Sequence, residues 1–176
     1  MLRNKGFLID GFCITPSILC GQLQANGVPS HRIWSLLNPN DRQDVVLGYS
    51  LLKEIWSLPP DLKTSNYMFG RAHNALKCYG KFTRNLIMPY ICVDLDLDEQ
   101  LIHLSTVAHM AFYLYTNNGA KTSFMPNKSY VDLIIMIKNV YFCIAKFKKE
   151  TQMENSSSFS WVLTTSRAFL ASFGQL

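Results

Sequence analysis

Residues 94–149 read DLDLDEQLIHLSTVAHMAFYLYTNNGAKTSFMPNKSYVDLIIMIKNVYFCIAKFKK, and this stretch decides the fold of the chain. It contains two apolar-rich segments, 98–117 and 128–149, separated by polar residues. In the first segment, apolar residues recur every three or four positions, at Leu101, Leu104, Ala108, Ala111, Phe112 and Tyr115. This spacing is typical of one face of an α-helix, and we predict a helix over 98–117.

The ends and composition of the two segments predict a helical hairpin. Asp96 stands where an N-cap is expected, with Glu99 three positions later, so both carboxylates would lie at the positive end of the helix dipole. The second segment is apolar almost all round, apart from a polar residue every seven positions at Asp132, Asn139 and Lys146. We expect such a helix to be largely buried by its neighbours.

Helix start and stop signals predict further helices on both sides of the hairpin. Thr15-Pro16 followed by Gly27 is a start and stop pair in the preferred order. Pro59-Pro60 stops the third helix, and we expect Pro89 to break the fourth. The predicted ranges are 16–26, 30–37, 41–57, 65–88 and 159–173. The apolar face predicted for the third helix consists of Val45, Tyr49, Leu52 and Trp56.

Signals for β-structure are weak. We expect residues 1–15 to form an irregular or extended lead, and we interpret no Asn-Gly or Asp-Gly pair as a hairpin turn. We therefore predict an all-α, bundle-like fold centred on the helical hairpin of 98–117 and 128–149. The length of 176 residues suits one helical domain over 1–176, which we expect to be a fragment of a larger protein.

Charge and cysteine content narrow the class of protein. The net charge of +5 and pI near 9.0 permit a nucleic acid partner without requiring one. The five cysteines contain no C-x-x-C pair, which favours reduced, buried thiols in an intracellular protein and makes metal ligation by cysteine unexpected. We expect no membrane span, because Lys138 and Asn139 interrupt the best apolar run.

The acidic cluster at 94–99 is a candidate for metal chemistry. It begins like a calcium-binding loop, but Glu99 stands where the turn needs glycine and Ser105 where a bidentate glutamate is needed. We therefore interpret the cluster as a helix cap. A small metal-dependent enzyme that uses Asp94, Asp96 and His103 is a weaker hypothesis. We predict no metal site, no cofactor and no catalytic residue in this chain.

A basic stripe on the fourth predicted helix is the main candidate for binding. His73, Lys77, Lys81 and Arg84 recur at helical spacing opposite the apolar side, and no acid interrupts them between Lys63 and Asp94. A continuous basic stripe is what a helix that follows DNA phosphates needs. A second basic set contains Lys146, Lys148 and Lys149. The alternative interpretation of each set is an ordinary solvated helix surface or a favourable charge near a helix C-terminus.

Several idiosyncratic strings in the chain resemble a widespread family of fungal transposase-like proteins. The strings are Asn38–Asp44, Leu51–Pro59, Pro89–Leu95, Thr122–Pro126 and Ile137–Lys146. The family is encoded by DNA transposons and is similar to the P-element and Kyakuja–Dileera–Zisupton groups. The resemblance extends from about Gly6 to Trp161.

The resemblance implies a ribonuclease-H-like enzyme with three acidic ligands for divalent metal, Mg²⁺, and a large helical insertion between the second acid and the third. This chain would correspond to the insertion, so the first two acids are missing. The family's third acid lies in a stretch that matches Ser166–Gly174, where this chain has no glutamate. The resemblance therefore carries no catalytic residue over to this chain.

Two hypotheses follow. The first is a non-catalytic domain or relic of a transposase, located in the nucleus, that binds DNA or a partner chain, either a second copy or a parent transposase. Its candidate DNA-binding residues are His73, Lys77, Lys81, Arg84, Lys146 and Lys149. The second is a helical protein–protein interaction module, indicated by the bulky residues Trp34, Trp56, Trp161 and Phe173.

Overall fold

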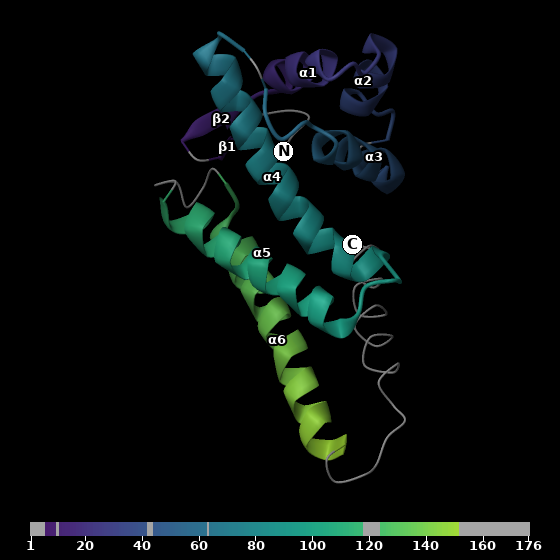
Figure 1. Ribbon diagram of the computed structural model, residues 1–176, viewed down its shortest axis with the longest axis vertical. Coiled ribbons are helices and arrows are strands. Elements are labelled where there is room, and N and C mark those ends of the chain that lie inside the picture. Colours follow the sequence, from purple (N-terminus) through teal and green to yellow (C-terminus); the bar gives the residue numbers. More distant parts are fainter. Residues whose placement is uncertain (1–5, 10, 42–43, 63, 118–123, 152–176) are drawn as a thin grey trace.

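The computed structural model describes residues 6–9, 11–41, 44–62, 64–117 and 124–151 (Figure 1). In chain order, the elements are β1 (Phe7–Ile9), β2 (Phe12–Ile14), α1 (Pro16–Ala25), α2 (Ser30–Leu37), α3 (Val45–Trp56), α4 (Tyr67–Ile91), α5 (Leu97–Asn117) and α6 (Asn127–Thr151). Helices make up most of these residues, which confirms the all-α prediction. The predicted helix over 159–173, with Trp161 and Phe173, lies outside the described residues.

The two strands form a short antiparallel hairpin, so the expectation of a lead without a hairpin turn was wrong. Phe7 pairs with Ile14, and Gly11 between the strands has a φ of 70°. The sequence pair Asp10-Gly11 at this point is a typical hairpin signal. Each strand has only three residues, too few for an alternating pattern to stand out. The hairpin packs on α4, where the centroids of the Phe7 and Tyr79 rings lie 4.7 Å apart.

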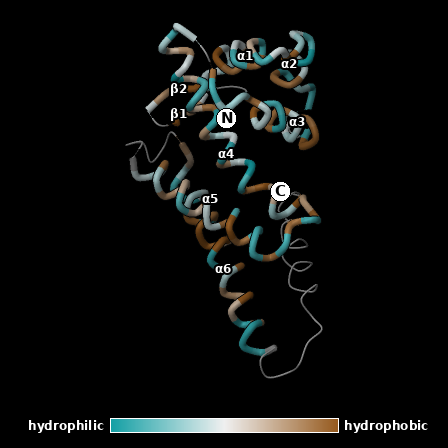
Figure 2. The backbone as a smooth tube through the Cα atoms, viewed as in Figure 1, coloured by the Kyte–Doolittle hydropathy of each residue, from teal (hydrophilic) through white to brown (hydrophobic). Residues whose placement is uncertain are grey.

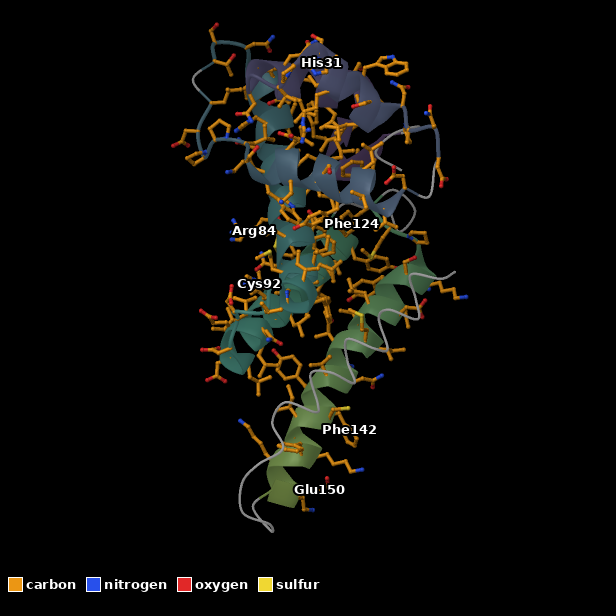
Figure 3. All side chains as sticks on the ribbon, turned by 90° about the vertical axis from the view of Figure 1, so that its right-hand side faces the viewer. His31, Arg84, Cys92, Phe124, Phe142 and Glu150 are labelled. Atoms are coloured by element: carbon orange, nitrogen blue, oxygen red, sulfur yellow. The ribbon has the colours of Figure 1, made fainter. Side chains whose placement is uncertain are left out.

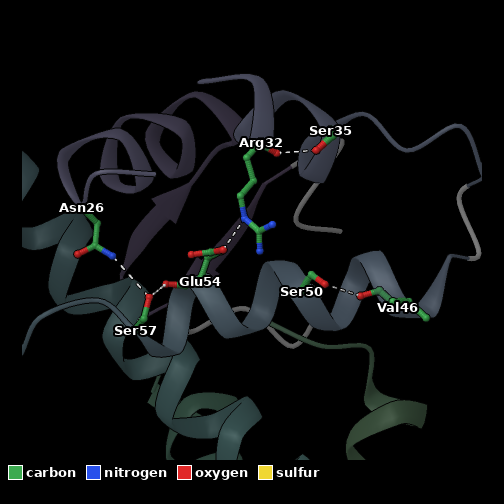
Figure 4. Close-up of polar contacts among 7 residues, drawn as sticks. All are labelled: Asn26, Arg32, Ser35, Val46, Ser50, Glu54 and Ser57. Atoms are coloured by element: carbon green, nitrogen blue, oxygen red, sulfur yellow. Dashed lines mark hydrogen bonds and ion pairs between the residues drawn. The ribbon is translucent and has the colours of Figure 1, made fainter. Parts of the chain in front are cut away.

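Helices α1, α2 and α3 pack together beside the upper half of α4 (Figure 1). The predicted start of α1 is confirmed, because the Thr15 hydroxyl accepts a hydrogen bond from the Ile18 N–H at 3.3 Å. An ion pair at 2.7 Å between Arg32 Nε and Glu54 Oε1 joins α2 to α3 (Figure 4). The three helices thus form one packed unit that rests on α4.

The buried face of α3 differs from the predicted one. Val45 is 74% exposed, and the residues that α3 buries are Leu51 and Ile55. Each lies one position before a residue of the predicted face, which turns that face by about 100°. The reason is that α3 packs on two neighbours, α2 and α4, and its own periodicity does not show which side they occupy.

Helix α4 continues through Pro89 to Ile91, which corrects the predicted break at Pro89. Proline removes one N–H from the helix, but the ladder resumes at once, because the Cys92 N–H donates to the Met88 carbonyl at 3.0 Å. Pro89 is buried, and the neighbouring Tyr90 hydroxyl reaches the Met136 sulfur of α6 at 4.0 Å. Burial in tertiary contacts offsets the lost hydrogen bond.

Helices α5 and α6 form the predicted hairpin, and α5 lies between α6 and the lower half of α4 (Figure 1). The capping prediction is confirmed, because Asp96 Oδ1 accepts from the Glu99 N–H at 2.7 Å and Glu99 Oε2 accepts from the Asp96 N–H at 3.1 Å. The rings of Tyr115 and Tyr130 stack at 4.1 Å near the loop end of the hairpin.

The expectation that α6 would be largely buried was wrong. Of its described side chains, only Ile137 and Ile144 are buried, and Phe142 is 70% exposed. Hydrophobic residues occur along most of α6, up to its hydrophilic last turn (Figure 2), but within the described chain α5 is its main packing partner. One neighbour covers one side of a helix, so the opposite side stays in solvent.

Two further expectations concern the cysteines and the membrane. Cys13 and Cys143 are exposed and Cys20, Cys78 and Cys92 are half-buried, so the prediction of buried thiols was wrong. None of these five residues forms a disulfide. None of the described helices is long and apolar enough to cross a membrane.

Candidate nucleic-acid interface

Helix α4 is the element that carries the main candidate site. Its 25 residues include four lysines and arginines and no aspartate or glutamate. It is also the element against which α1, α3, α5 and both strands pack. Its cationic residues are therefore presented by the most extensively packed helix of the described chain.

His73 does not belong to a solvated stripe, which corrects its predicted position. Its side chain is 1% exposed. Nδ1 lies 3.0 Å from Gln22 Oε1 of α1, and Nε2 lies 2.9 Å from the Pro59 carbonyl oxygen. Gln22 is buried as well, and its Nε2 donates to the Phe69 carbonyl at 2.9 Å. His73 is a structural residue that joins α4 to α1 and to the connection between α3 and α4.

Lys77 stands at the border of the packed surface. Its Nζ donates to the Leu58 carbonyl at 3.1 Å, and the side chain is half-buried. Together, Lys77 and His73 satisfy two successive carbonyl groups after the end of α3. Lys77 lies at the edge of the exposed surface, but it is less free to follow a ligand than a fully exposed lysine.

Lys81 and Arg84 are exposed, as the stripe predicted. Figure 3 shows Arg84 pointing away from the packed helices. Arg71 is also exposed, and the sequence reasoning missed it. We define the α4 basic face as Arg71, Lys77, Lys81 and Arg84. These residues extend about 20 Å along the helix and occupy an arc of about 140° around it.

The signal that could have identified Arg71 was the position of the other exposed residues. The predicted stripe started at His73 and took every fourth residue, and this line of residues follows the edge of the buried side of α4. The exposed side of α4 is centred nearer Asn74 and Lys81. Arg71 lies about one turn before Asn74 on this exposed side. Burial of His73 depends on Gln22, which the sequence of α4 alone does not reveal.

The second basic set lies on another part of the molecule. Lys146 and Lys149 are exposed in the last turns of α6, where Lys146 Nζ lies 3.8 Å from Glu150 Oε1. Figure 3 shows Arg84 well separated from Glu150, and α5 lies between α4 and α6. The structure therefore does not bring the two predicted basic sets into one surface.

The acidic cluster does not assemble a metal site with His103. Asp96 and Glu99 cap α5, and His103 Nδ1 lies 2.6 Å from Asn85 Oδ1 of α4. Among the described residues, no group of three or more His, Cys, Asp or Glu side chains is arranged to hold a metal ion. His103 and His109 also have separate partners, since His109 Nδ1 lies 2.8 Å from the Ser105 carbonyl oxygen.

Two tyrosines have perturbed acidity, and both are packing residues. Burial raises the pKa of Tyr79 to about 12. Burial also raises the pKa of Tyr90, whose hydroxyl contacts the Met136 sulfur. Desolvation disfavours the charged phenolate in each case, so both hydroxyls are held in their neutral form.

Comparisons of this chain with known protein families, with curated proteins and with solved structures give no match.

Proposed function

We propose that this chain is a non-catalytic helical domain, derived from a transposase-like protein, that binds DNA through the α4 basic face. The observation that carries the proposal is that the 25-residue helix α4 contains four lysines and arginines and no aspartate or glutamate. Lysine and arginine side chains that neutralise phosphates release counterions from DNA, and this release drives binding that does not depend on sequence.

The geometry of α4 suits contact with one stretch of DNA backbone. Along the helix axis, Lys77 lies about 9 Å from Arg71, Lys81 about 6 Å from Lys77, and Arg84 about 4.5 Å from Lys81. Arg71, Lys81 and Arg84 are exposed, so their long side chains can follow phosphates spaced over such a distance, and Lys77 adds a cation at the edge of this surface. The acidic residues Asp94 and Asp98 follow the C-terminal end of α4 and bound the interface there, because they repel phosphate.

The transposase origin rests on the family resemblance of the sequence. It supplies the reason to expect DNA rather than another polyanion, and it is also the reason to expect a nuclear protein. The stretch that matches the family's third acid, Ser166–Gly174, contains no glutamate, and this departure supports a non-catalytic role. A parent transposase subunit is the protein partner that this origin favours.

A second candidate function is a helical protein–protein interaction module. The observation that favours it is the number of large apolar side chains exposed on α5 and α6: Ile102, Phe112, Tyr113, Val131, Ile135, Tyr141 and Phe142. Of the tryptophans first considered, Trp34 is exposed, whereas Trp56 Nε1 donates to Thr83 Oγ1 at 3.0 Å and packs against Tyr49. An interface would therefore use Trp34 or the hairpin rather than Trp56.

The proposal is tested by a salt titration of DNA binding with charge-reversal variants. Lys81→Glu/Arg84→Glu removes the exposed centre of the α4 basic face. Lys53→Glu/Lys148→Glu changes the net charge by the same −4, from +5 to +1, at exposed residues elsewhere. Loss of binding in the first variant and not in the second supports DNA binding by α4.

A further inference from the structure

The end of α6 projects beyond the rest of the hairpin. Tyr141 Oη donates to the Leu101 carbonyl at 2.9 Å, close to the start of α5. The ten residues 142–151 continue as helix past this contact for about 15 Å. Figure 1 shows this lower part of α6 extending beyond α5. We call these residues the α6 arm.

The outward side of α6 combines apolar and cationic residues. Helical spacing places Val131, Ile135, Lys138, Phe142 and Lys149 within about 60° of one another, on the side away from α5. All five are exposed. The acids of α6, Asp132 and Glu150, lie outside this strip, which we call the α6 strip. Helix α6 as a whole has five lysines and two acids.

The junction between α4 and α5 combines exposed apolar residues with negative charge, whereas the α6 strip combines them with positive charge. Ile91, Val93 and Ile102 are exposed there, with Val93 72% exposed. Asp94 and Asp98 are exposed beside them, and the ion pairs of the described chain, Arg32–Glu54 and Lys146–Glu150, include neither aspartate. Helix α5 contains no lysine or arginine. We call these five residues the acidic junction.

We propose that the α6 strip and arm of one copy dock on the acidic junction of a second copy of this chain. The two surfaces are complementary, because each offers exposed apolar side chains beside charges of one sign and the signs are opposite. Both surfaces belong to the same chain, and we propose that the two copies are related by a two-fold axis, so that the contact occurs twice and the assembly closes as a dimer. A projecting helix end can reach a partner where an embedded one cannot.

The acidic junction favours a second copy over DNA or an anionic lipid surface as the partner of the α6 strip. DNA or an anionic lipid surface would match the lysines of the α6 strip but would leave Asp94, Asp98 and the apolar residues around them without a partner. A second copy engages both surfaces at once. This inference does not depend on DNA binding, because it uses neither Lys81 nor Arg84.

The test is a charge exchange, read by sedimentation equilibrium of the full chain over a concentration series. Variant A carries Lys138→Glu/Lys149→Glu on the α6 strip, and variant B carries Asp94→Lys/Asp98→Lys on the acidic junction. We expect the wild-type chain to dimerise, and each variant alone to self-associate at least about tenfold more weakly, because like charges then meet. An equimolar mixture of A and B restores opposite charges at both contacts and should form a heterodimer.

Control measurements keep the outcome clear. Far-UV circular dichroism and thermal melting establish that A and B are folded, and Lys81→Glu/Arg84→Glu should dimerise like the wild type. A wild-type chain that stays monomeric at all concentrations overturns the inference, even if it binds vesicles of anionic lipid. A mixture of folded A and B that remains monomeric while the wild type dimerises also overturns it, because the dimer would then use other surfaces.

Discussion

His73 Nδ1 lies 3.0 Å from Gln22 Oε1, and both side chains are buried between α4 and α1. The second ring nitrogen lies 2.9 Å from the Pro59 carbonyl oxygen, so one side chain connects three parts of the chain. A buried polar group is stabilising only while its partners are in place. The contact therefore gives His73 a role in stability that is separate from DNA binding.

His73→Ala should lower the free energy of unfolding by about 2–4 kcal/mol, because it leaves a cavity and removes hydrogen-bond partners from Gln22 and Pro59. Urea unfolding followed by circular dichroism measures the change. His31→Ala is the control, because His31 is exposed on α2 and should change stability by less than about 0.5 kcal/mol. Equal free energies of unfolding for the two variants would show that the buried contact does not stabilise the fold measurably.

Gly80 allows α4 to approach α3 closely, whereas Gly48 on α3 does not face a neighbour. A Cβ at Gly80 would lie 3.2 Å from Ile55 Cγ2, and a Cβ at Gly48 would have no such atom within 4 Å. Gly48→Ala should stabilise the protein by about 0.5–1 kcal/mol through helix propensity. Gly80→Ala should be less stable than Gly48→Ala by about 1 kcal/mol or more, because packing strain opposes the same gain. Thermal melting of the pair decides this, and equal gains would contradict the close approach.

Asp96→Ala should cost about 1 kcal/mol, because Asp96 is the N-cap of α5 and exchanges hydrogen bonds with Glu99. The matched control is Asp61→Ala, an exposed aspartate in the connection between α3 and α4. Both variants remove one carboxylate, so a difference between them in urea unfolding isolates the cap. If both are as stable as the wild type, the capping box contributes nothing measurable.

Tyr79 should make the fold sensitive to alkaline pH. Its pKa is about 12 in the folded chain, against 10.0 for an ordinary tyrosine, because it is buried. Between these two values the folded state holds more protons than the unfolded state, so stability is full below pH 10 and is lost as pH rises toward 12. The loss is on the order of 2–3 kcal/mol.

Tyr79→Phe removes this ionisation, so the variant should lose less stability than the wild type as pH rises over that window. Chemical unfolding at a series of pH values measures the effect. Tyr113→Phe, at an exposed position of α5, should keep the wild-type dependence. Parallel curves for Tyr79→Phe and the wild type would mean that the Tyr79 hydroxyl is not desolvated in the fold.

Local signals predicted the features of the fold that depend on few neighbouring residues. The Thr15 cap of α1 and the Asp96–Glu99 capping box involve atoms at most three residues apart, so their sequence patterns are sufficient. The hairpin of α5 and α6 follows from apolar periodicity over long segments. The cap hydrogen bonds are local, so they form wherever the helix forms.

Features that depend on distant partners escaped prediction. His73 is buried because Gln22, 51 residues away, faces it. Helix α4 passes through Pro89 because its surroundings bury that residue. The apolar composition of α6 indicated burial, but composition does not reveal how many neighbours a helix has. In the candidate site, Lys81 and Arg84 are exposed as predicted, because they lie on the side of α4 that no described neighbour covers, whereas Arg71 was missed and His73 was misplaced.

The central claim is most directly tested by fluorescence anisotropy of a short labelled DNA duplex, titrated with protein at several salt concentrations. For the wild type, four phosphate contacts predict a slope of log K against log salt of about −3.6. Lys81→Glu/Arg84→Glu should bind at least about tenfold more weakly and reduce the slope by about 2, because two contacts are lost. Lys53→Glu/Lys148→Glu should lose much less affinity. Absence of wild-type binding at low salt, or equal losses in the two folded variants, would contradict DNA binding by the α4 basic face.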